Sequence, residues 1–299
     1  MWKPLGALLL AAGAAAPAIA QPTAPERDAS PKTDIVIQGV RPSDKQVTDF
    51  VRALTAVPSS GQISRFHSPV CPVAMGLPQV QNDRIAERMR LVAAAATMPV
   101  APVKCSPNAF VIVAPDKAAA IRDLERRFPA YLSQLSEREV RKLTDAASPA
   151  AAWQVKSLLT ADGEAAAKAV GADYYTVSGT QSPSRIKAAS MPTFSVSVVV
   201  IDVKAAAGLT LTQLADYAAM RTFADVAPER IARVGVPSIL DVLAQPDDRP
   251  LPVTLTYWDL GFLKSLYATD NSYYASYQRG DMQRVVKKEV EHSGRDPRN

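Results

Sequence analysis

Histidine, a residue type that could carry out chemistry, is scarce in this chain. The 299-residue sequence contains only two histidines, His67 and His292. A histidine-based zinc site needs two or three ligands at helical or hairpin spacing, and these two residues lack that spacing. The sequence also lacks a G-x-S-x-G turn, a Walker loop and a G-x-G-x-x-G fingerprint. It therefore predicts no metal site and no cofactor.

Acidic, phenolic and guanidinium side chains are the remaining candidates for catalysis. Asp216, Tyr217 and Arg221 fall on one predicted helix, 211–223, and are weak candidates for the active site of a hydrolase of non-standard type. Two adjacent aspartates at 247–248 lie in a predicted loop. A glycosidase needs two carboxylates at a fixed separation across a cleft, and nothing in the sequence places a pair in that way. Ordinary surface acids are the alternative interpretation.

The N-terminal segment predicts export. Residues 1–20 are typical of a secretory signal peptide, in which Lys3 and an apolar run at 5–17 precede the A-x-A cleavage site at 18–20. Cleavage would leave Gln21 as the first residue of the mature chain. A membrane anchor or an Ala-rich disordered tail is the alternative, but the run is shorter than the ~20 residues that span a bilayer. We expect a periplasmic or secreted protein without a membrane span after cleavage.

The predicted export decides how the two cysteines, Cys71 and Cys105, are interpreted. In a reducing compartment they would be free, metal-bound or redox-active, whereas an exported protein pairs them by default in one disulfide. They do not form a C-x-x-C motif, so the sequence gives no support for thioredoxin-like chemistry. The prediction is a structural Cys71–Cys105 bridge.

Composition limits the class of partner. Hydrophobic residues make up 47% of the chain and charged residues 21%, which are values of a globular protein. Its net charge of +5 is a mild excess of basic residues and indicates nucleic-acid binding only weakly. Export makes a nucleic-acid partner less suitable still. We expect no nucleic-acid partner; an envelope protein or an anionic polymer of the envelope remains open.

Hydrophobic periodicity predicts an α+β fold with a mixed sheet and packed helices. Capping-box patterns mark helix starts at Ser43 and Ser136, while Asn82 and Thr256 are predicted to cap two further helices. Strands are predicted in four apolar or β-branched runs, at 33–40, 109–113, 174–178 and 194–203.

The chain is predicted to contain five segments. They are the signal peptide 1–20, a flexible leader 21–32, an N-terminal α/β region 33–145 with the disulfide, a C-terminal α+β region 150–270, and a charged C-terminal tail 271–299.

One part of the chain, 194–267, resembles the end of a zincin metallopeptidase domain of the metzincin type. Strand 198–202 and helix 211–221 precede a turn at 237–240 that reads PSIL. Segment 255–267 then follows the pattern L-T-x-x-D-x-x-x-L-x-x-L-Y. In that family, an edge strand leads into an active-site helix with the motif H-E-x-x-H.

The helix that should carry this motif departs from it. Residues 215–221 read ADYAAMR, with no histidine to hold zinc and no glutamate to act on water. The resemblance therefore implies a degenerate, zincin-like pseudoenzyme; the alternative is a helix of small residues packed on a sheet. Separately, the C-P-x-x-x-G-L element at 71–77 is similar to one in a family of uncharacterised exported bacterial proteins, which implies export and no particular activity.

The function expected from the sequence is non-catalytic binding or scaffolding in the cell envelope. The alternative is a peptidase-like hydrolase that uses Asp216, Tyr217 and Arg221 in a non-standard active site. A third possibility is that the basic net charge binds an anionic surface, an interaction that salt would weaken; the alternative is an ordinary solvated basic surface.

Overall fold

The computed structural model describes residues 42–55, 57–168, 175–244 and 250–293. In these ranges the chain has nine α-helices and a mixed four-stranded sheet, which confirms the predicted α+β class. The predicted signal peptide, the leader, the strand at 33–40 and the aspartates at 247–248 lie outside the described residues.

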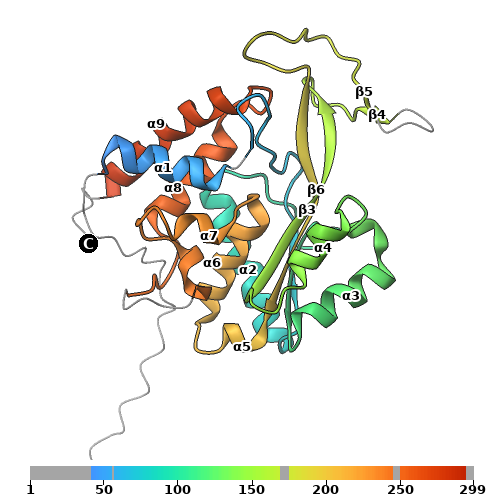
Figure 1. The fold of residues 1–299 in the computed structure, drawn as a ribbon, viewed down its shortest axis with the longest axis vertical. Helices are drawn as coiled ribbons and strands as arrows, with labels where there is room; N and C mark the ends of the chain where they lie inside the picture. The colour runs from blue at the N-terminus through green and yellow to red at the C-terminus, as the bar shows by residue number, and fades with distance from the viewer. Residues whose placement is uncertain (1–41, 56, 169–174, 245–249, 294–299) are drawn as a thin grey trace, which may run out of the picture. The chain divides into compact units, whose positions relative to one another are not determined.

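The helices and strands follow one another along the chain in a mostly alternating order (Figure 1). Their bounds are α1 Asp44–Leu54, β1 Pro72–Met75, α2 Gln79–Ala95, β2 Ala109–Ala114, α3 Lys117–Arg127, a 3₁₀ turn Pro129–Tyr131, α4 Glu137–Leu143, β3 Ala150–Thr160, β4 Ala167–Lys168, β5 Tyr175–Thr176, β6 Ser190–Asp202, α5 Val203–Ala206, α6 Leu211–Phe223, α7 Pro228–Ile231, a 3₁₀ turn Ile239–Leu243, α8 Tyr257–Ala268 and α9 Ala275–Ser293.

The sheet has the strand order β1-β2-β6-β3. The pairs β1–β2 and β2–β6 are parallel, whereas β3 runs antiparallel to β6. The strands β1 and β2 belong to the predicted N-terminal region, whereas β6 and β3 belong to the predicted C-terminal region, and β6 pairs with β2. The two regions therefore share one sheet.

Helices cover both faces of this sheet. Along β6, Val199 and Ile201 join the larger core with α2 and α6, while Val198 and Val200 join a second core with α3 and α4. This alternation follows from the two-residue period of a strand. Figure 1 shows α3 and α4 on one side of β3 and β6, with α2 and α6 on the other. Because both faces are buried, β6 reads as a continuous apolar run.

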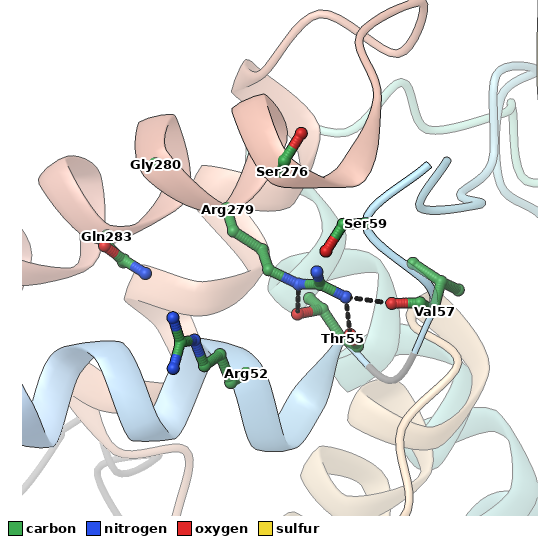
Figure 2. Close-up of a pocket in the computed structure, with 8 residues that line it drawn as sticks. All are labelled: Arg52, Thr55, Val57, Ser59, Ser276, Arg279, Gly280 and Gln283. Atoms are coloured by element: carbon green, nitrogen blue, oxygen red, sulfur yellow. Dashed lines mark hydrogen bonds between the residues drawn. The ribbon is translucent and has the colours of Figure 1, made fainter. Parts of the chain in front are cut away.

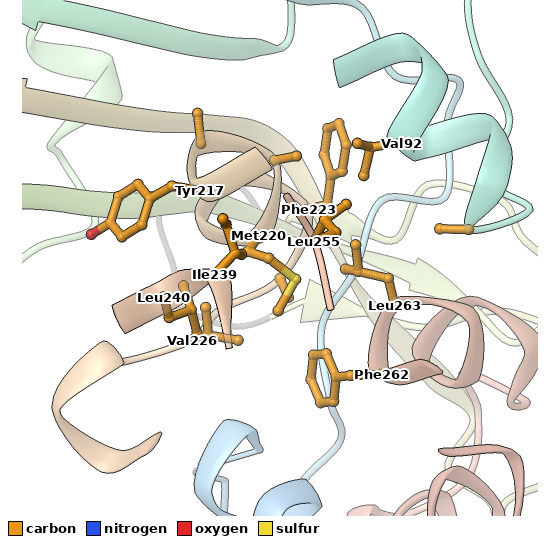
Figure 3. Packing of buried hydrophobic residues seen from close by; sticks show 14 of the residues in the cluster. Val92, Tyr217, Met220, Phe223, Val226, Ile239, Leu240, Leu255, Phe262 and Leu263 are labelled. Carbon is orange, nitrogen blue, oxygen red and sulfur yellow. The ribbon is translucent and has the colours of Figure 1, made fainter. Parts of the chain in front are cut away.

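The helices α1, α8 and α9 form a second layer that packs against α6. The ring of Phe50 in α1 lies edge-on to Trp258 and Phe262 of α8, with centroids 5.1 Å and 6.2 Å apart. Figure 3 shows Phe262 and Leu263 of α8 near Met220 and Phe223 of α6. All four are at most 1% exposed, so the core is continuous from the sheet to this outer layer.

The distal half of the β3–β6 pair extends beyond the sheet. Pairing of β6 with β2 begins at Ser197, so residues 190–196 pair with β3 on one side and meet Arg65 in an isolated bridge at Thr193 on the other. Figure 1 shows this part as a two-stranded arm, with β4 and β5 near its tip. The free edge of β3 is partly covered, because the Gln134 side chain bonds both backbone groups of Lys156.

The predicted disulfide is present. Cys71 and Cys105 are bonded, with their Cα atoms 6.1 Å apart. Cys71 directly precedes β1 and Cys105 lies in the loop that leads to β2, so the bridge closes the loop of chain that contains β1 and α2. The part of the chain that the structure describes contains no helix long and apolar enough to cross a membrane.

Two local predictions were wrong. The second helix begins at Gln79 with Pro78 as its N-cap, not after a cap at Asn82, because the Pro78 carbonyl accepts the first helical hydrogen bond from the Asn82 N–H at 3.1 Å. The Asn82 side chain instead bonds the backbone of Leu77. The segment before it contains the strand β1, which is absent from the predicted strands because four residues are too few to show a period in the sequence.

Candidate functional site

Asp216, the first of the weak catalytic candidates, is fully buried in α6. Its carboxylate accepts hydrogen bonds from Arg88 Nε at 2.7 Å and Arg88 Nη2 at 3.0 Å, so the two side chains form a bidentate ion pair. Thr254 Oγ1 donates to it at 2.6 Å and the Leu255 backbone N–H at 2.9 Å. These donors use both carboxylate oxygens and join α2, α6 and the segment before α8. The geometry is that of a structural clamp.

Tyr217 and Arg221, the other two candidates, bond each other. Arg221 Nη1 donates to the Tyr217 hydroxyl at 2.7 Å, one helical turn away. Burial raises the pKa of the Tyr217 phenol. Both side chains are at least nine-tenths buried, and Figure 3 shows Tyr217 among the core residues. Arg221 Nε has no hydrogen-bond partner within the described ranges. The structure thus places all three candidates on α6, but only Tyr217 and Arg221 are in contact.

Asp259 is a further buried acid, which appeared in the sequence only as the aspartate of the L-T-x-x-D pattern that begins at Leu255. Its carboxylate accepts from Ser238 Oγ at 2.6 Å, from the Ile239 N–H at 2.8 Å, and from the N–H and hydroxyl of Thr256 at 3.0 Å and 2.8 Å. Burial raises its pKa to about 6, although these four donors oppose the shift. The carboxylate ties the 238–239 turn to the start of α8.

The two histidines do not form a site together. His67 is exposed in the loop before β1, and His292 is exposed near the end of α9, where its Nδ1 lies 2.7 Å from the Lys288 carbonyl oxygen. Across the described ranges, no group of three His, Cys, Asp or Glu side chains could hold a metal ion.

The structure instead brings two arginines together in a pocket between α1 and α9, which we call the arginine pocket. Its volume is about 590 Å³. Figure 2 shows the side chains around it. The lining residues come from α1, the turn that follows it and the first half of α9: Arg52, Thr55, Val57, Ser59, Ser276, Arg279, Gly280 and Gln283.

Local hydrogen bonds hold the pocket in shape. Arg279 Nε donates to Thr55 Oγ1 at 3.0 Å, and Nη2 donates to the Thr55 carbonyl at 2.6 Å and to the Val57 carbonyl. The N–H of Ser276 donates to the Ser59 carbonyl at 3.2 Å. The guanidinium plane of Arg279 is therefore fixed, with Nε and Nη2 turned towards the chain after α1.

The electrostatics of the arginine pocket favour an anion. Within the described ranges, neither Arg52 nor Arg279 forms an ion pair with a carboxylate. Burial and, next, repulsion from the Arg52 guanidinium lower the pKa of Arg279. An anion between the two would offset this repulsion, since an opposite charge favours the charged form of each. Because Nε and Nη2 of Arg279 already donate to Thr55 and Val57, Arg279 can offer Nη1 to an anion, while Arg52 can offer the planar fork of donors that matches carboxylate and phosphate.

The sequence did not indicate this pocket. Its walls come from opposite ends of the described chain, and one hydrogen bond across it joins residues 224 positions apart. The spacing of residues within a motif cannot indicate that segments so far apart in the sequence meet in the fold. The mild basic excess was the only related signal, and it does not identify which arginines are unpaired.

Comparison with known proteins adds no assignment. No family model matches the chain, and neither a curated protein nor a solved structure matches it.

Proposed function

We propose that the chain is an exported, non-catalytic binding or scaffolding protein of the cell envelope that holds an anionic group of its partner in the arginine pocket. The observation that carries the proposal is the pair of guanidinium groups, Arg52 and Arg279, that share one pocket without a carboxylate partner in the described part of the chain. Ser59, Ser276 and Gln283 add neutral donors around them.

The alternative, a hydrolase built on Asp216, Tyr217 and Arg221, has less support. Each of these side chains is at least nine-tenths buried, and Asp216 accepts four hydrogen bonds that already serve the fold. A general base must come within hydrogen-bond distance of the proton that it removes. The zincin-like interpretation of 194–267 remains a prediction, as does its status as a pseudoenzyme.

Export is supported by the Cys71–Cys105 bridge, since disulfides persist mainly in oxidising compartments. Mass spectrometry of the protein from the periplasmic or secreted fraction tests it. We expect a mature chain that begins at Gln21, whereas recovery of the whole chain from the cytoplasm with both thiols reduced would contradict export.

Calorimetric titration with inorganic phosphate and with acetate tests the pocket. We expect saturable binding of at least one of the two anions at low ionic strength, weakened by salt because the contact is charged. Arg52→Gln should abolish it. Arg284→Gln is the matched control, because it removes an equal charge from α9 at a residue outside the arginine pocket.

A second variant distinguishes binding inside the arginine pocket from attraction of the anion by the net charge of the protein. A Cβ at Gly280 would meet nothing within 4 Å, so Gly280→Leu should fold while its side chain fills part of the pocket. We expect weaker anion binding with both arginines retained. Equal binding by the native protein, Arg52→Gln and Gly280→Leu would overturn the proposal.

A further inference from the structure

The arginine pocket is larger than the anionic group that its two arginines would hold. Its volume of about 590 Å³ lies within the range of about 300–1,000 Å³ that is typical of pockets for small organic ligands. A phosphate ion, which consists of one phosphorus atom and its oxygens, would fill only a small part of this space. The rest is available to the group that carries the phosphate.

One wall of the pocket is a row of polar side chains on α9. Ser276, Arg279 and Gln283 are spaced at i, i+3 and i+7, which places them on one face of the helix. The helical rise of 1.5 Å per residue makes this row about 10 Å long. Figure 2 shows Arg279 in the middle, with Ser276 and Ser59 towards one end of the row and Gln283 and Arg52 towards the other. A group bound at Arg279 therefore has polar side chains on both sides.

The neutral side chains of the pocket keep their hydrogen-bonding capacity. Within the described ranges, the hydroxyls of Ser59 and Ser276 and the amide of Gln283 form no hydrogen bond with another protein group. Each of these groups can both donate and accept. Among the described lining residues, only Val57 has an apolar side chain. An alkyl group in the pocket would displace water from these polar groups without replacing its hydrogen bonds, whereas hydroxyl groups would replace them.

The charged donors of the pocket match the terminal oxygens of a phosphate monoester. The fork of Arg52 can bond two oxygens, and Nη1 of Arg279 can bond a third. A phosphate monoester has three terminal oxygens and a charge of about −1.5 to −2 at neutral pH. A carboxylate has only two oxygens and a single charge, so it would leave one of these donors unused.

We infer that the ligand of the arginine pocket is a phosphate monoester of a saccharide or polyol, whose phosphate lies between Arg52 and Arg279. Its hydroxyl groups bond the side chains of Ser59, Ser276 and Gln283. This inference rests on the proposed function. It adds the chemical class of the ligand and the residues that select it.

Two phosphate esters with the same number of carbon atoms test it. Glucose 6-phosphate and n-hexyl phosphate, used below its aggregation concentration, differ in that only the sugar carries hydroxyl groups. In calorimetric titrations, glucose 6-phosphate should bind more tightly than hexyl phosphate, by about twofold to tenfold for each hydrogen bond that its hydroxyl groups form. Glucuronate is the third probe, and it should bind more weakly than glucose 6-phosphate because its carboxylate has fewer oxygens and less charge.

The double variant Ser59→Ala/Ser276→Ala tests the sites of the hydroxyl groups. Both serines are exposed, and alanine favours the helix at position 276, so the variant should fold. The preference for glucose 6-phosphate over hexyl phosphate should fall by about fourfold or more, because two hydrogen bonds are lost. Gln283→Ala provides a second measurement at the other end of the row. Ser60→Ala is the matched control, because Ser60 is exposed and does not line the pocket, and it should keep the preference.

The outcomes separate the inference from the proposed function. Equal or tighter binding of hexyl phosphate, with both esters dependent on Arg52, would overturn the saccharide or polyol and leave the anion pocket. A preference for glucose 6-phosphate that survives both Ser59→Ala/Ser276→Ala and Gln283→Ala would overturn the assignment of the hydroxyl sites. Glucuronate that binds as tightly as glucose 6-phosphate would overturn the phosphate. Affinities unaffected by Arg52→Gln would overturn the proposed function itself.

Discussion

Replacing Asp216 by leucine removes the acceptor of four hydrogen bonds from a site that solvent does not reach. Arg88, whose side chain is 17% exposed, would lose its counter-ion while remaining largely buried. The hydroxyl of Thr254 and the N–H of Leu255 would lose their acceptor as well. Breaking a buried ion pair by removing one partner costs about 3–5 kcal/mol, so we expect the free energy of unfolding to fall by that amount.

Urea unfolding followed by circular dichroism measures this loss, and the thermal midpoint should fall by roughly 6–20 °C. In the double variant Arg88→Met/Asp216→Leu, apolar groups replace both charges and much of the stability should return. A loss below about 1 kcal/mol for Asp216→Leu, or strictly additive losses in the double variant, would refute the structural role. Asp216 would then again be a candidate for a functional acid.

The remaining predictions concern a buried acid, the disulfide and a tight backbone approach. Burial raises the pKa of Asp259 from 3.8 to about 6, so on raising the pH the unfolded chain loses this proton before the folded chain does. The free energy of unfolding should therefore fall by about 3 kcal/mol as the pH rises from about 4 to about 6. Asp259→Asn should lose most of that pH dependence in urea titrations. Replacing Cys71 and Cys105 by alanine should cost about 3–4 kcal/mol of unfolding free energy, because the open loop regains chain entropy; unchanged urea midpoints would contradict this. Gly76 has φ +99° and a Cβ there would lie 1.9 Å from the Val113 carbonyl oxygen, so Gly76→Ala should lower the thermal midpoint, and an unchanged midpoint would be the contrary result.

Local signals made most helices predictable. The capping boxes that begin at Ser43 and Ser136 mark real helix starts, and Thr256 caps α8 as expected. The bounds predicted for α6, 211–223, are those of the structure. In each case a few neighbouring residues carry the information, because a cap satisfies backbone groups within one turn.

Elements that depend on distant partners were harder to predict. The strand β1 has four residues and exists because it pairs with β2, from which α2 separates it along the chain. The arginine pocket is an extreme case, since Arg52 and Arg279 meet only after α1 packs against α9. A sequence lists the charges of such side chains but does not show which of them lack a partner after folding.

Side-chain NMR of the arginines during a phosphate and acetate titration tests the central claim most directly. The Nε–H signal of Arg52 and the Nη1 signal of Arg279 should shift together and saturate with the bound anion, while the signals of Arg284, outside the arginine pocket, should stay in place. Equal shifts at all arginines, or no shift at Arg52 and Arg279 when either anion binds, would contradict the assignment of this pocket as the binding site.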